Sequence, residues 1–338
     1  IMGFQPEFQV LNTNLVQFEK RHTVIRVICS SGVMVRFGYA CINSQLRAEG
    51  IFTNRKFGSV ARAIDAGLDG LSERALLNVT DLERIVHWNA DHDVEVFRIS
   101  SEMFSHITHP EAGYQLEDLP DYDEISDIMA RTGRFAQSVN QRLSFHPGPY
   151  NVLGSHRESV VAKTVIELNH HGKVMDMLAQ PRDHRAKINI HVGTGQEGAL
   201  ERFARNVDLL DESVRSRLTV ENDDRASLHS VADLAPMSHD IDVPVVFDYH
   251  HHSFCDGGLS EQQALELALD TWSVRPCTHY SESAGLEVNN PKFSGKPTPA
   301  HSILVEGPVE TYGYDFDCVI EAKGKELAMN HLLSKGLY

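Results

Sequence analysis

Short apolar runs rich in β-branched residues alternate with longer amphipathic stretches from residue 34 onward. Eight of these runs have the length and composition of strands. They are VRFGYA (35–40), EVFRIS (95–100), QRLSFHP (141–147), KINIHVG (187–193), RLTVEND (217–223), VPVVFDYHH (243–251), PCTHYSE (276–282) and DCVIEAKG (317–324). Between several of them, apolar residues recur at helical three-and-four spacing, as in 59–88, 122–140, 197–216 and 260–273. The pattern predicts eight strand–helix units.

Strands that alternate with helices pair in parallel, and eight such units favour a closed barrel over an open sheet. We therefore predict an α/β fold, a TIM-like (β/α)8 barrel formed as a single domain by residues 34–338. The seventh unit is the weakest, because residues 289–302 have the composition of a loop. Residues 1–33 form an N-terminal extension whose order the sequence leaves open, although HTVIRVIC (22–29) could add a strand.

Composition and charge narrow the class of protein. With 41% hydrophobic and 23% charged residues, the chain is typical of a soluble globular protein. It contains neither an apolar run of about 20 residues for a membrane span nor a secretory signal pattern, so a cytoplasmic location is expected. The five cysteines lack CxxC spacing, which excludes a zinc ribbon and a disulfide framework. A net charge of −16 argues against indiscriminate nucleic-acid binding but allows a local basic or metal-lined site.

Side chains of metal-ligand type end each of the predicted strands three to eight, and two more histidines follow strand two (His109) and precede strand eight in a loop (His301). Catalytic groups of such barrels lie at the carboxyl ends of the strands. The residues are His109, His146, His191, Glu221, Asp248, His251, His279, His301 and Glu321. A single strand-end histidine is more often a hydrogen-bonded structural residue than a ligand. Nine such residues on one rim are much harder to explain as accidents.

Three carboxylates that converge on one mouth repel one another unless cations balance them, so the cluster argues for divalent metal. Nitrogen and oxygen ligands without thiolate fit manganese or zinc better than calcium or an iron–sulfur cluster. The set is too large for one ion, and two or three ions favour hydrolysis of a phosphate ester. Within FDYHHH (247–252), we expect Asp248 and His251 to reach one ion, and His250 and His252 to lie outside the ligand set.

Several longer segments resemble one enzyme family. They are RFGYAC (36–41), TNR (53–55), LERIVHWNADHDVEVFRISSEMF (82–104), THP (108–110), RLSFHPGPY (142–150), HVG (191–193), VENDD (220–224), VPVVFDYHHH (243–252), HYS (279–281) and EAKGKE (321–326). On these segments the chain resembles the ultraviolet damage endonucleases, a barrel family related to the endonuclease IV type of apurinic endonuclease. The resemblance covers nearly the whole predicted barrel.

The resemblance implies a DNA-repair endonuclease, acting as a monomer, that hydrolyses damaged double-stranded DNA 5′ to cyclobutane pyrimidine dimers and 6-4 photoproducts. A disturbed lesion costs less to extrude than intact bases, and an aromatic ring can occupy the gap it leaves. The nine predicted ligands match the family's ligands, for which Mn²⁺ is preferred here over Zn²⁺ or Mg²⁺. Catalysis is assigned to Glu221, Asp248, His279 and Glu321. Contacts to DNA or the lesion are assigned to Tyr39, Asn54, Arg55, Tyr150, Lys323 and Lys325.

Two positions depart from the family pattern. Pro149 stands in HPGPY where the family usually has glutamine, which removes an amide able to probe the lesion. Cys277 stands two residues before His279, where the family usually has lysine able to tune the metal cluster. A thiolate there could act as a soft ligand that favours zinc, although a buried inert thiol is the commoner fate of cysteine.

Three other functions stay open from the sequence. A metal-dependent sugar isomerase would also gather histidines and carboxylates at the strand ends. An apurinic endonuclease without photoproduct preference would fit the loss of glutamine at Pro149. A catalytically inactive damage-binding protein would fit a metal centre disabled at Cys277.

Overall fold

The computed structural model describes residues 17–21, 24–28, 32–287, 295–336 and 338. Within these ranges one parallel sheet has the strand order β8-β7-β6-β5-β4-β3-β10-β9. Its strands are β3 (Val35–Ala40), β4 (Val96–Ile99), β5 (Arg142–Phe145), β6 (Ile188–Ile190), β7 (Leu218–Glu221), β8 (Val245–Val246), β9 (Cys277–Tyr280) and β10 (Phe316–Ile320). Seven of the eight strands fall inside a predicted run, and β10 begins one residue before its run, at Phe316.

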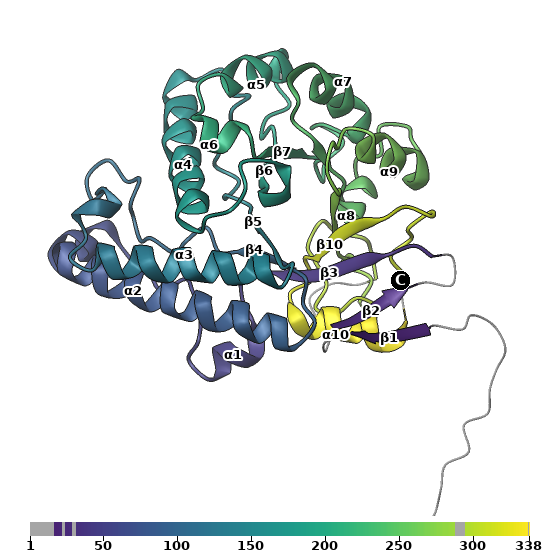
Figure 1. The fold of residues 1–338 in the computed structure, drawn as a ribbon. Coiled ribbons are helices and arrows are strands. Elements are labelled where there is room, and N and C mark those ends of the chain that lie inside the picture. The colour runs from purple at the N-terminus through teal and green to yellow at the C-terminus, as the bar shows by residue number, and fades with distance from the viewer. Residues whose placement is uncertain (1–16, 22–23, 29–31, 288–294, 337) are drawn as a thin grey trace, which may run out of the picture.

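The two ends of this sheet meet. A bridge joins Asp248 to His279, where the amide of His279 donates to the carbonyl of Phe247 at 2.8 Å. The sheet is therefore a nearly closed barrel with helices around it (Figure 1), and the predicted TIM-like fold is confirmed. Before the barrel, β1 (Gln17–Arg21) and β2 (Val24–Ile28) form an antiparallel hairpin, so the strand expected within 22–29 is present.

The surrounding helices carry ordinary end signals. They are α1 (Ser44–Ala48), α2 (Val60–Asp91), α3 (Tyr122–Ser138), α4 (Glu158–Met177), α5 (Ala199–Val207), α6 (Glu212–Arg215), α7 (Val231–Ile241), α8 (Tyr249–His252), α9 (Glu261–Leu269) and α10 (Glu326–Lys335), with 3₁₀ turns η1 (Leu116–Asp118) and η2 (His184–Ala186). Ser59 caps α2, Ser230 caps α7 and Ser260 caps α9, each by accepting a backbone N–H. The segment 197–216, read as one helix, divides into α5 and α6.

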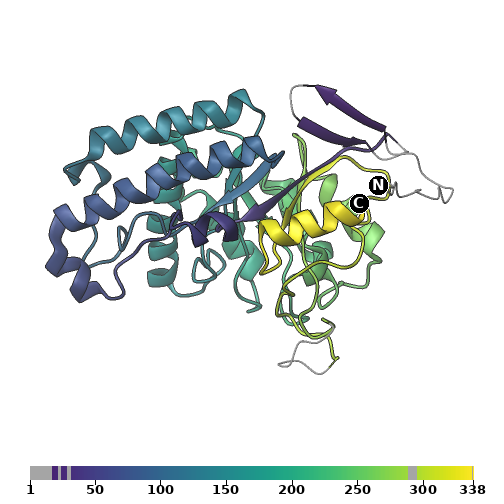
Figure 2. The ribbon, with the colours of Figure 1, turned by 90° about the horizontal axis from the view of Figure 1, so that it is seen from below.

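Two features of the helical layer bear on the predictions. Helix α2 bends at Gly67, where φ is 61°, and it runs alongside α3 in both ribbon views (Figure 2). Between β9 and β10 the described residues contain no helix, as the loop-like composition predicted.

The barrel interior changes character along its axis. At the amino ends of the strands, the fully buried Asp317 accepts hydrogen bonds from Arg36, Arg142 and Arg275 at 2.5–2.9 Å. Above this floor lies a layer of small side chains, Ala40, Val96, Cys277 and Val319. Strands β3 and β4 approach closely, since a Cβ at Gly38 would lie 1.6 Å from the carbonyl oxygen of Val96.

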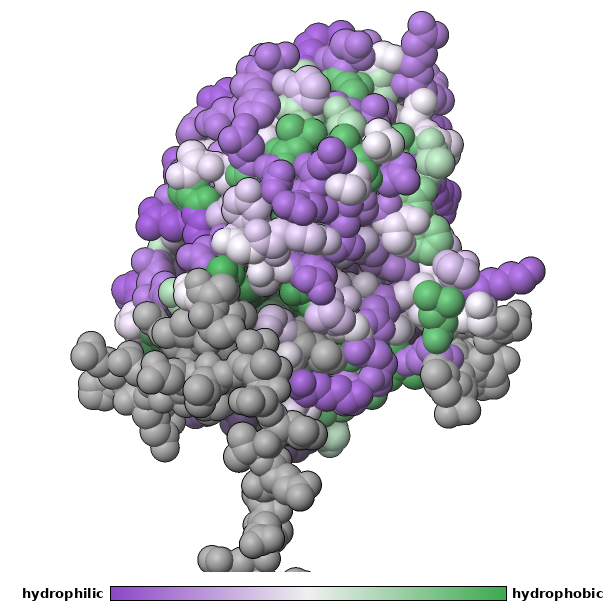
Figure 3. All heavy atoms as spheres, turned by 90° about the vertical axis from the view of Figure 1, so that its right-hand side faces the viewer, coloured by the Kyte–Doolittle hydropathy of each residue, from purple (hydrophilic) through white to green (hydrophobic). Residues whose placement is uncertain are grey.

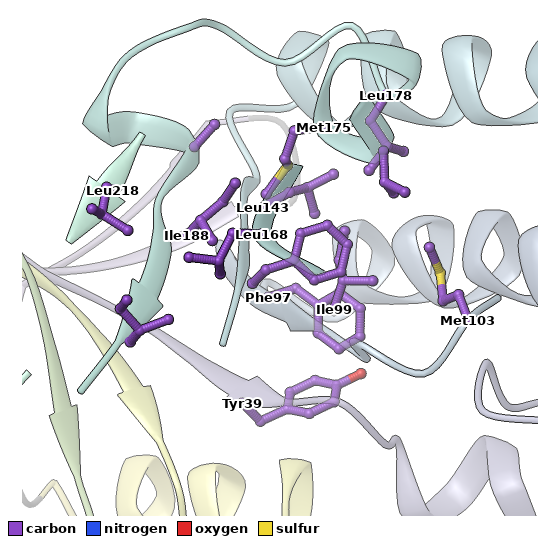
Figure 4. Close-up of a cluster of buried hydrophobic side chains, with 14 of the residues drawn as sticks. Tyr39, Phe97, Ile99, Met103, Leu143, Leu168, Met175, Leu178, Ile188 and Leu218 are labelled. Carbon is purple, nitrogen blue, oxygen red and sulfur yellow. The ribbon is translucent and has the colours of Figure 1, made fainter. Parts of the chain in front are cut away.

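The larger apolar core lies between the strands and the helices. Figure 4 shows part of it, where Tyr39, Phe97 and Ile99 stack beneath Leu143 and Leu168. The face in Figure 3 is mainly hydrophilic where it is coloured, with apolar residues scattered singly or in small groups. None of the helices in the described ranges is long and apolar enough to cross a membrane.

Candidate metal centre

Glu221 is the central residue of the site, and the last residue of β7. Its Oε2 lies 3.0 Å from Nε2 of His146, which follows β5, and 4.0 Å from Nε2 of His191, which follows β6. One ligand atom from each of these three residues fits within 4.8 Å of the others, so they can share one metal ion. The barrel brings them together because adjacent parallel strands end at the same rim.

A second group uses the same carboxylate. Ligand atoms of Glu221, Asp248, His279 and Glu321 also lie within 4.8 Å of one another. His279 Nδ1 lies 3.1 Å from Glu221 Oε2 and 2.9 Å from Glu321 Oε1. Because Glu221 belongs to both groups, its carboxylate could take part in holding an ion at either one.

Buried polar atoms without partners provide a test of whether these residues suit a metal. Glu221 Oε1, Asp248 Oδ2 and His279 Nδ1 are buried and make no hydrogen bond of suitable geometry, although carboxylate oxygens lie close to His279 Nδ1. Such groups cost stability when they stay unsatisfied. Carboxylate oxygens and an imidazole nitrogen converging in this way form a donor set that divalent cations prefer. The residues therefore fit the metal that the sequence predicts.

Charge interactions keep the carboxylates ionised. Burial alone would raise the pKa of Glu221, but the surrounding imidazoles, His279 foremost, outweigh it and hold the pKa well below its usual range. Burial would likewise raise the pKa of Glu321, yet Arg98 and His279 lower it well below normal. Both carboxylates are available as ligands at neutral pH.

The imidazoles respond according to their surroundings. Burial lowers the pKa of His146 to about 4, despite the nearby Glu221. For His251, burial also acts downward, but Asp248 and Glu221 overcome it and raise the pKa to about 9. Nδ1 of His251 lies 3.3 Å from Glu221 Oε1, so this residue borders both groups.

Four further side chains hold the candidate ligands, and sequence reasoning missed all of them. Asp223 Oδ1 lies 3.2 Å from Nδ1 of His191, and Asn189 donates to Glu221. Arg98 pairs with Glu321 from the end of β4. Lys187 reaches His279 from below, with Nζ 2.8 Å from Nε2. Asp223 lies in the motif VENDD (220–224), so its place beside the ligands could have been inferred from the sequence. The contact between Lys187 and His279 spans the barrel, and spacing within one strand does not predict it.

The other predicted ligands are spread around the two groups. His301 is held by Ser281, whose Oγ lies 2.6 Å from its Nδ1, and its ring centroid is 6.1 Å from that of His251. His109 packs near His106 and accepts a hydrogen bond from the Glu111 amide. Neither belongs to the two groups among the described residues. His250 bonds to the carbonyl of Pro299.

The predicted DNA contacts occupy different environments. Tyr150 is 90% exposed in the loop after β5, and Lys323 is exposed after β10. Arg55 is tied to Asp81 at 2.6 Å and stacks on the ring of Phe52. Asn54 and Lys325 are half-buried, and Asn54 Oδ1 has no hydrogen-bond partner.

Tyr39 does not lie where we expected. It is fully buried, packs on Phe97 with ring centroids 5.1 Å apart, and its hydroxyl donates to Asn89 at 2.7 Å (Figure 4). The reason is strand alternation: Val35, Phe37 and Tyr39 face the helices, while Ala40 joins the interior layer. A buried core tyrosine cannot contact DNA in this arrangement, so that prediction is wrong for the structure described.

Fold and site together define an α/β barrel with a candidate metal centre at the carboxyl ends of its strands. Residues 35–337 match the family described as UV-endonuclease UvdE. The chain belongs to this family, which confirms the resemblance seen in the sequence.

Individual relatives agree. The UV-damage endonuclease of Schizosaccharomyces pombe is 34% identical over 319 residues, which cover 88% of this chain and 50% of that protein. The UV-damage endonuclease of Neurospora crassa is 32% identical over 346 residues, which cover 88% of this chain and 50% of that protein. The chain thus spans about half the length of these fungal relatives. The crystal structure of SacUVDE superposes with a TM-score of 0.71 at 30% identity, covering 90% of this chain and 100% of that one.

Proposed function

We propose that this chain is a metal-dependent endonuclease that hydrolyses the backbone of damaged double-stranded DNA on the 5′ side of ultraviolet photoproducts. The observation that carries the proposal is the position of Glu221, whose carboxylate belongs to two ligand groups at the mouth of the barrel. Membership of the UvdE family supports the substrate class.

The residues that would hold the ions divide into two sets around Glu221. One set is His146 and His191, and the other is Asp248, His279 and Glu321. Divalent ions bound there, Mn²⁺ preferred, would activate water and neutralise charge on the phosphate oxygens. His251 and His301 stand beside the groups and supply ligands if a third ion binds.

The protein's own groups prepare the site for an anionic backbone. Arg98 is a half-buried cation beside Glu321, so its guanidinium offsets carboxylate charge next to the place where a phosphate would bind. On the rim, Lys323 and Tyr150 are exposed and free to reach a duplex. Since the whole chain has a net charge of −16, affinity should depend on this one face and fall steeply with salt.

A second candidate is an endonuclease for abasic sites without photoproduct preference. The observation that favours it is Pro149, an exposed residue next to Tyr150 with no side-chain amide to read a base. Both candidates share one metal centre and differ only in the lesion that reaches it.

The test uses purified protein, Mn²⁺ and three end-labelled duplexes, carrying a cyclobutane dimer, an abasic site or no lesion. Glu221→Gln keeps the shape of the central ligand and removes its charge, and it should lower incision at least about 100-fold because the shared carboxylate is lost. The matched control is Glu212→Gln on α6, an exposed carboxylate paired with Arg215, which should cut like wild type.

Cleavage 5′ to the dimer, lost in Glu221→Gln alone, would support the first candidate. Cleavage confined to the abasic duplex would select the second. Absence of cleavage with any divalent ion would contradict both and direct attention to the inactive damage-binding protein and the sugar isomerase.

A further inference from the structure

Asn222 directly follows Glu221 at the end of β7, and the proposed chemistry leaves it without a role. It has no exposed surface. Its side-chain amide contacts the backbone of Asp248 at two points: Oδ1 accepts from the Asp248 N–H at 2.8 Å, and Nδ2 donates to the Asp248 carbonyl at 3.0 Å. Both ends of the amide are therefore committed to one residue of the candidate metal centre.

This contact replaces a rung of the sheet. Glu221 of β7 lies beside Val246 of β8 in a parallel ladder. If the ladder continued, the backbone carbonyl of Asn222 would accept from the N–H of Asp248. The side chain of Asn222 takes that bond instead. Its backbone carbonyl is thereby free to accept from Nδ1 of His251, at 2.9 Å.

These bonds decide which side-chain atoms Asp248 and His251 can offer. Asp248 Oδ1 accepts the backbone N–H of His251 at 2.8 Å, whereas Oδ2 is buried without a hydrogen bond. His251 Nδ1 faces two acceptors, the Asn222 carbonyl at 2.9 Å and Glu221 Oε1 at 3.3 Å, so Nδ1 carries hydrogen. Oδ2 of Asp248 and Nε2 of His251 are the atoms left for a further partner.

A purely structural role explains Asn222 poorly. An ordinary rung would join β7 to the segment after β8, and it would not bury a side-chain amide, which costs free energy unless its hydrogen bonds are made. What the amide adds is the release of its own backbone carbonyl to His251. It also gives a second support to Asp248, whose bridge to His279 closes the barrel.

We propose that Asn222 is a positioning residue of the metal centre. Its amide fixes the backbone of Asp248 and frees its carbonyl for His251, so that Asp248 Oδ2 and His251 Nε2 are the atoms presented to an ion. Outer groups that orient ligands in this way commonly support metal sites. The inference rests on the proposed metal-dependent function. An ion at these two atoms would displace none of the hydrogen bonds that Asn222 makes.

The experiment measures Mn²⁺ affinity by calorimetry, melting temperature, and incision of the dimer duplex. Asn222→Ala should weaken Mn²⁺ binding and lower kcat about 10–100-fold, the usual effect of losing a group that orients a ligand, with KM for the duplex near wild type. The variant should stay folded, because the backbone carbonyl at 222 can then accept the Asp248 N–H as an ordinary rung. If the alanine variant does not fold, Asn222→Ser provides the same test.

A double-mutant cycle distinguishes positioning from a general loosening of the fold. Asp248→Asn removes the charge of the ligand that Asn222 supports. In that background, Asn222→Ala should weaken Mn²⁺ binding less than about 3-fold, because most of its effect acts through Asp248.

The matched control is Asn78→Ala. Asn78 is a fully buried asparagine on α2 whose amide makes the same two-point contact with the backbone of Arg55, at 3.0 and 3.1 Å. Arg55 belongs to neither ligand group. The control should lower the melting temperature and leave Mn²⁺ affinity unchanged.

Unchanged Mn²⁺ affinity in folded Asn222→Ala would overturn the inference. The same conclusion would follow if the full loss persisted in the Asp248→Asn background, or if Asn78→Ala showed a similar loss. If wild type binds Mn²⁺ but cuts no duplex, the proposed function fails while the affinity arm still decides the role of Asn222. If wild type binds no divalent ion, both ideas are overturned.

Discussion

Asp223 Oδ1 lies 3.2 Å from Nδ1 of His191, on the side of the ring opposite Glu221. The carboxylate thereby sets the orientation of the imidazole and leaves Nε2 directed at the candidate metal centre. Such outer carboxylates commonly accompany histidine ligands and raise their basicity.

Replacing Asp223 with asparagine should lower incision about 10–100-fold, because the ring loses its charged partner and metal affinity falls. Steady-state kinetics at several Mn²⁺ concentrations would show partial recovery at high metal. The neighbouring Asp224→Asn is the control, since Asp224 pairs only with Arg225 among the described ion pairs. Equal activity of both variants would contradict the assigned role.

Mn²⁺ should stabilise the folded protein. Burying Glu221, Asp248 and Glu321 side by side leaves charge that an ion would balance. A ligand present at 100 times its dissociation constant adds about 2.7 kcal/mol to the free energy of unfolding. Thermal melts should shift upward with Mn²⁺ and return with EDTA. Glu221→Gln should show a much smaller shift, and an equal shift would place the ion elsewhere.

If the chain binds damaged DNA as proposed, the exposed Tyr150 should contact it. Its ring is 90% exposed after β5, and stacking a base on such a ring contributes about 1–3 kcal/mol. Tyr150→Ala should therefore weaken binding of the dimer duplex about 5- to 150-fold, measured by fluorescence anisotropy. Tyr314→Ala serves as control, because this exposed tyrosine precedes β10 at the opposite end of the barrel. Unaltered binding by Tyr150→Ala would remove it from the interface.

Tyr39 should affect stability instead. Its hydroxyl connects Asn43 and Asn89 inside the protein. Tyr39→Phe removes the hydrogen-bond partner of Asn43 Nδ2 and of Asn89 Oδ1 and should reduce the free energy of unfolding by about 1–3 kcal/mol, measured in urea. DNA affinity of the folded variant should not change. Reduced affinity without reduced stability would restore Tyr39 as a DNA contact.

Acid should destabilise the fold partly through His171. The ring is 1% exposed, lies edge-on to Phe145, and its pKa is lowered by burial. Below about pH 6.5 the unfolded chain binds a proton that the folded chain resists, so stability is full above this pH and declines as pH falls. His171→Leu should reduce the slope of the free energy of unfolding against pH, measured below pH 6.5, by up to about 1.4 kcal/mol per pH unit. His239→Gln, at an exposed position, should leave the slope unchanged.

The sequence predicted the parts of this protein that depend on repetition along the chain. Alternating strands and helices defined the barrel, and the barrel rule then placed Glu221, Asp248 and Glu321 on one rim. Alternation of side chains along β3 also predicts the position of Tyr39, because Tyr39 points to the same face of the strand as Val35 and Phe37.

Residues that act on a ligand from another strand could not be predicted in this way. Arg98 and Lys187 approach Glu321 and His279 through the barrel interior. The distances between these side chains depend on the register of each strand relative to the next, and residue spacing within one strand does not encode that register. Three-dimensional contact was needed to find them.

The barrel closes where its first and last strands in the sheet order, β8 and β9, meet. It is closed by the bridge between Asp248 and His279, and those two residues also belong to one ligand group. An ion bound by both would fasten the last gap in the barrel wall, and opening the wall would pull its ligands apart. Closure of the barrel wall and binding of the proposed ion would therefore depend on the same two residues.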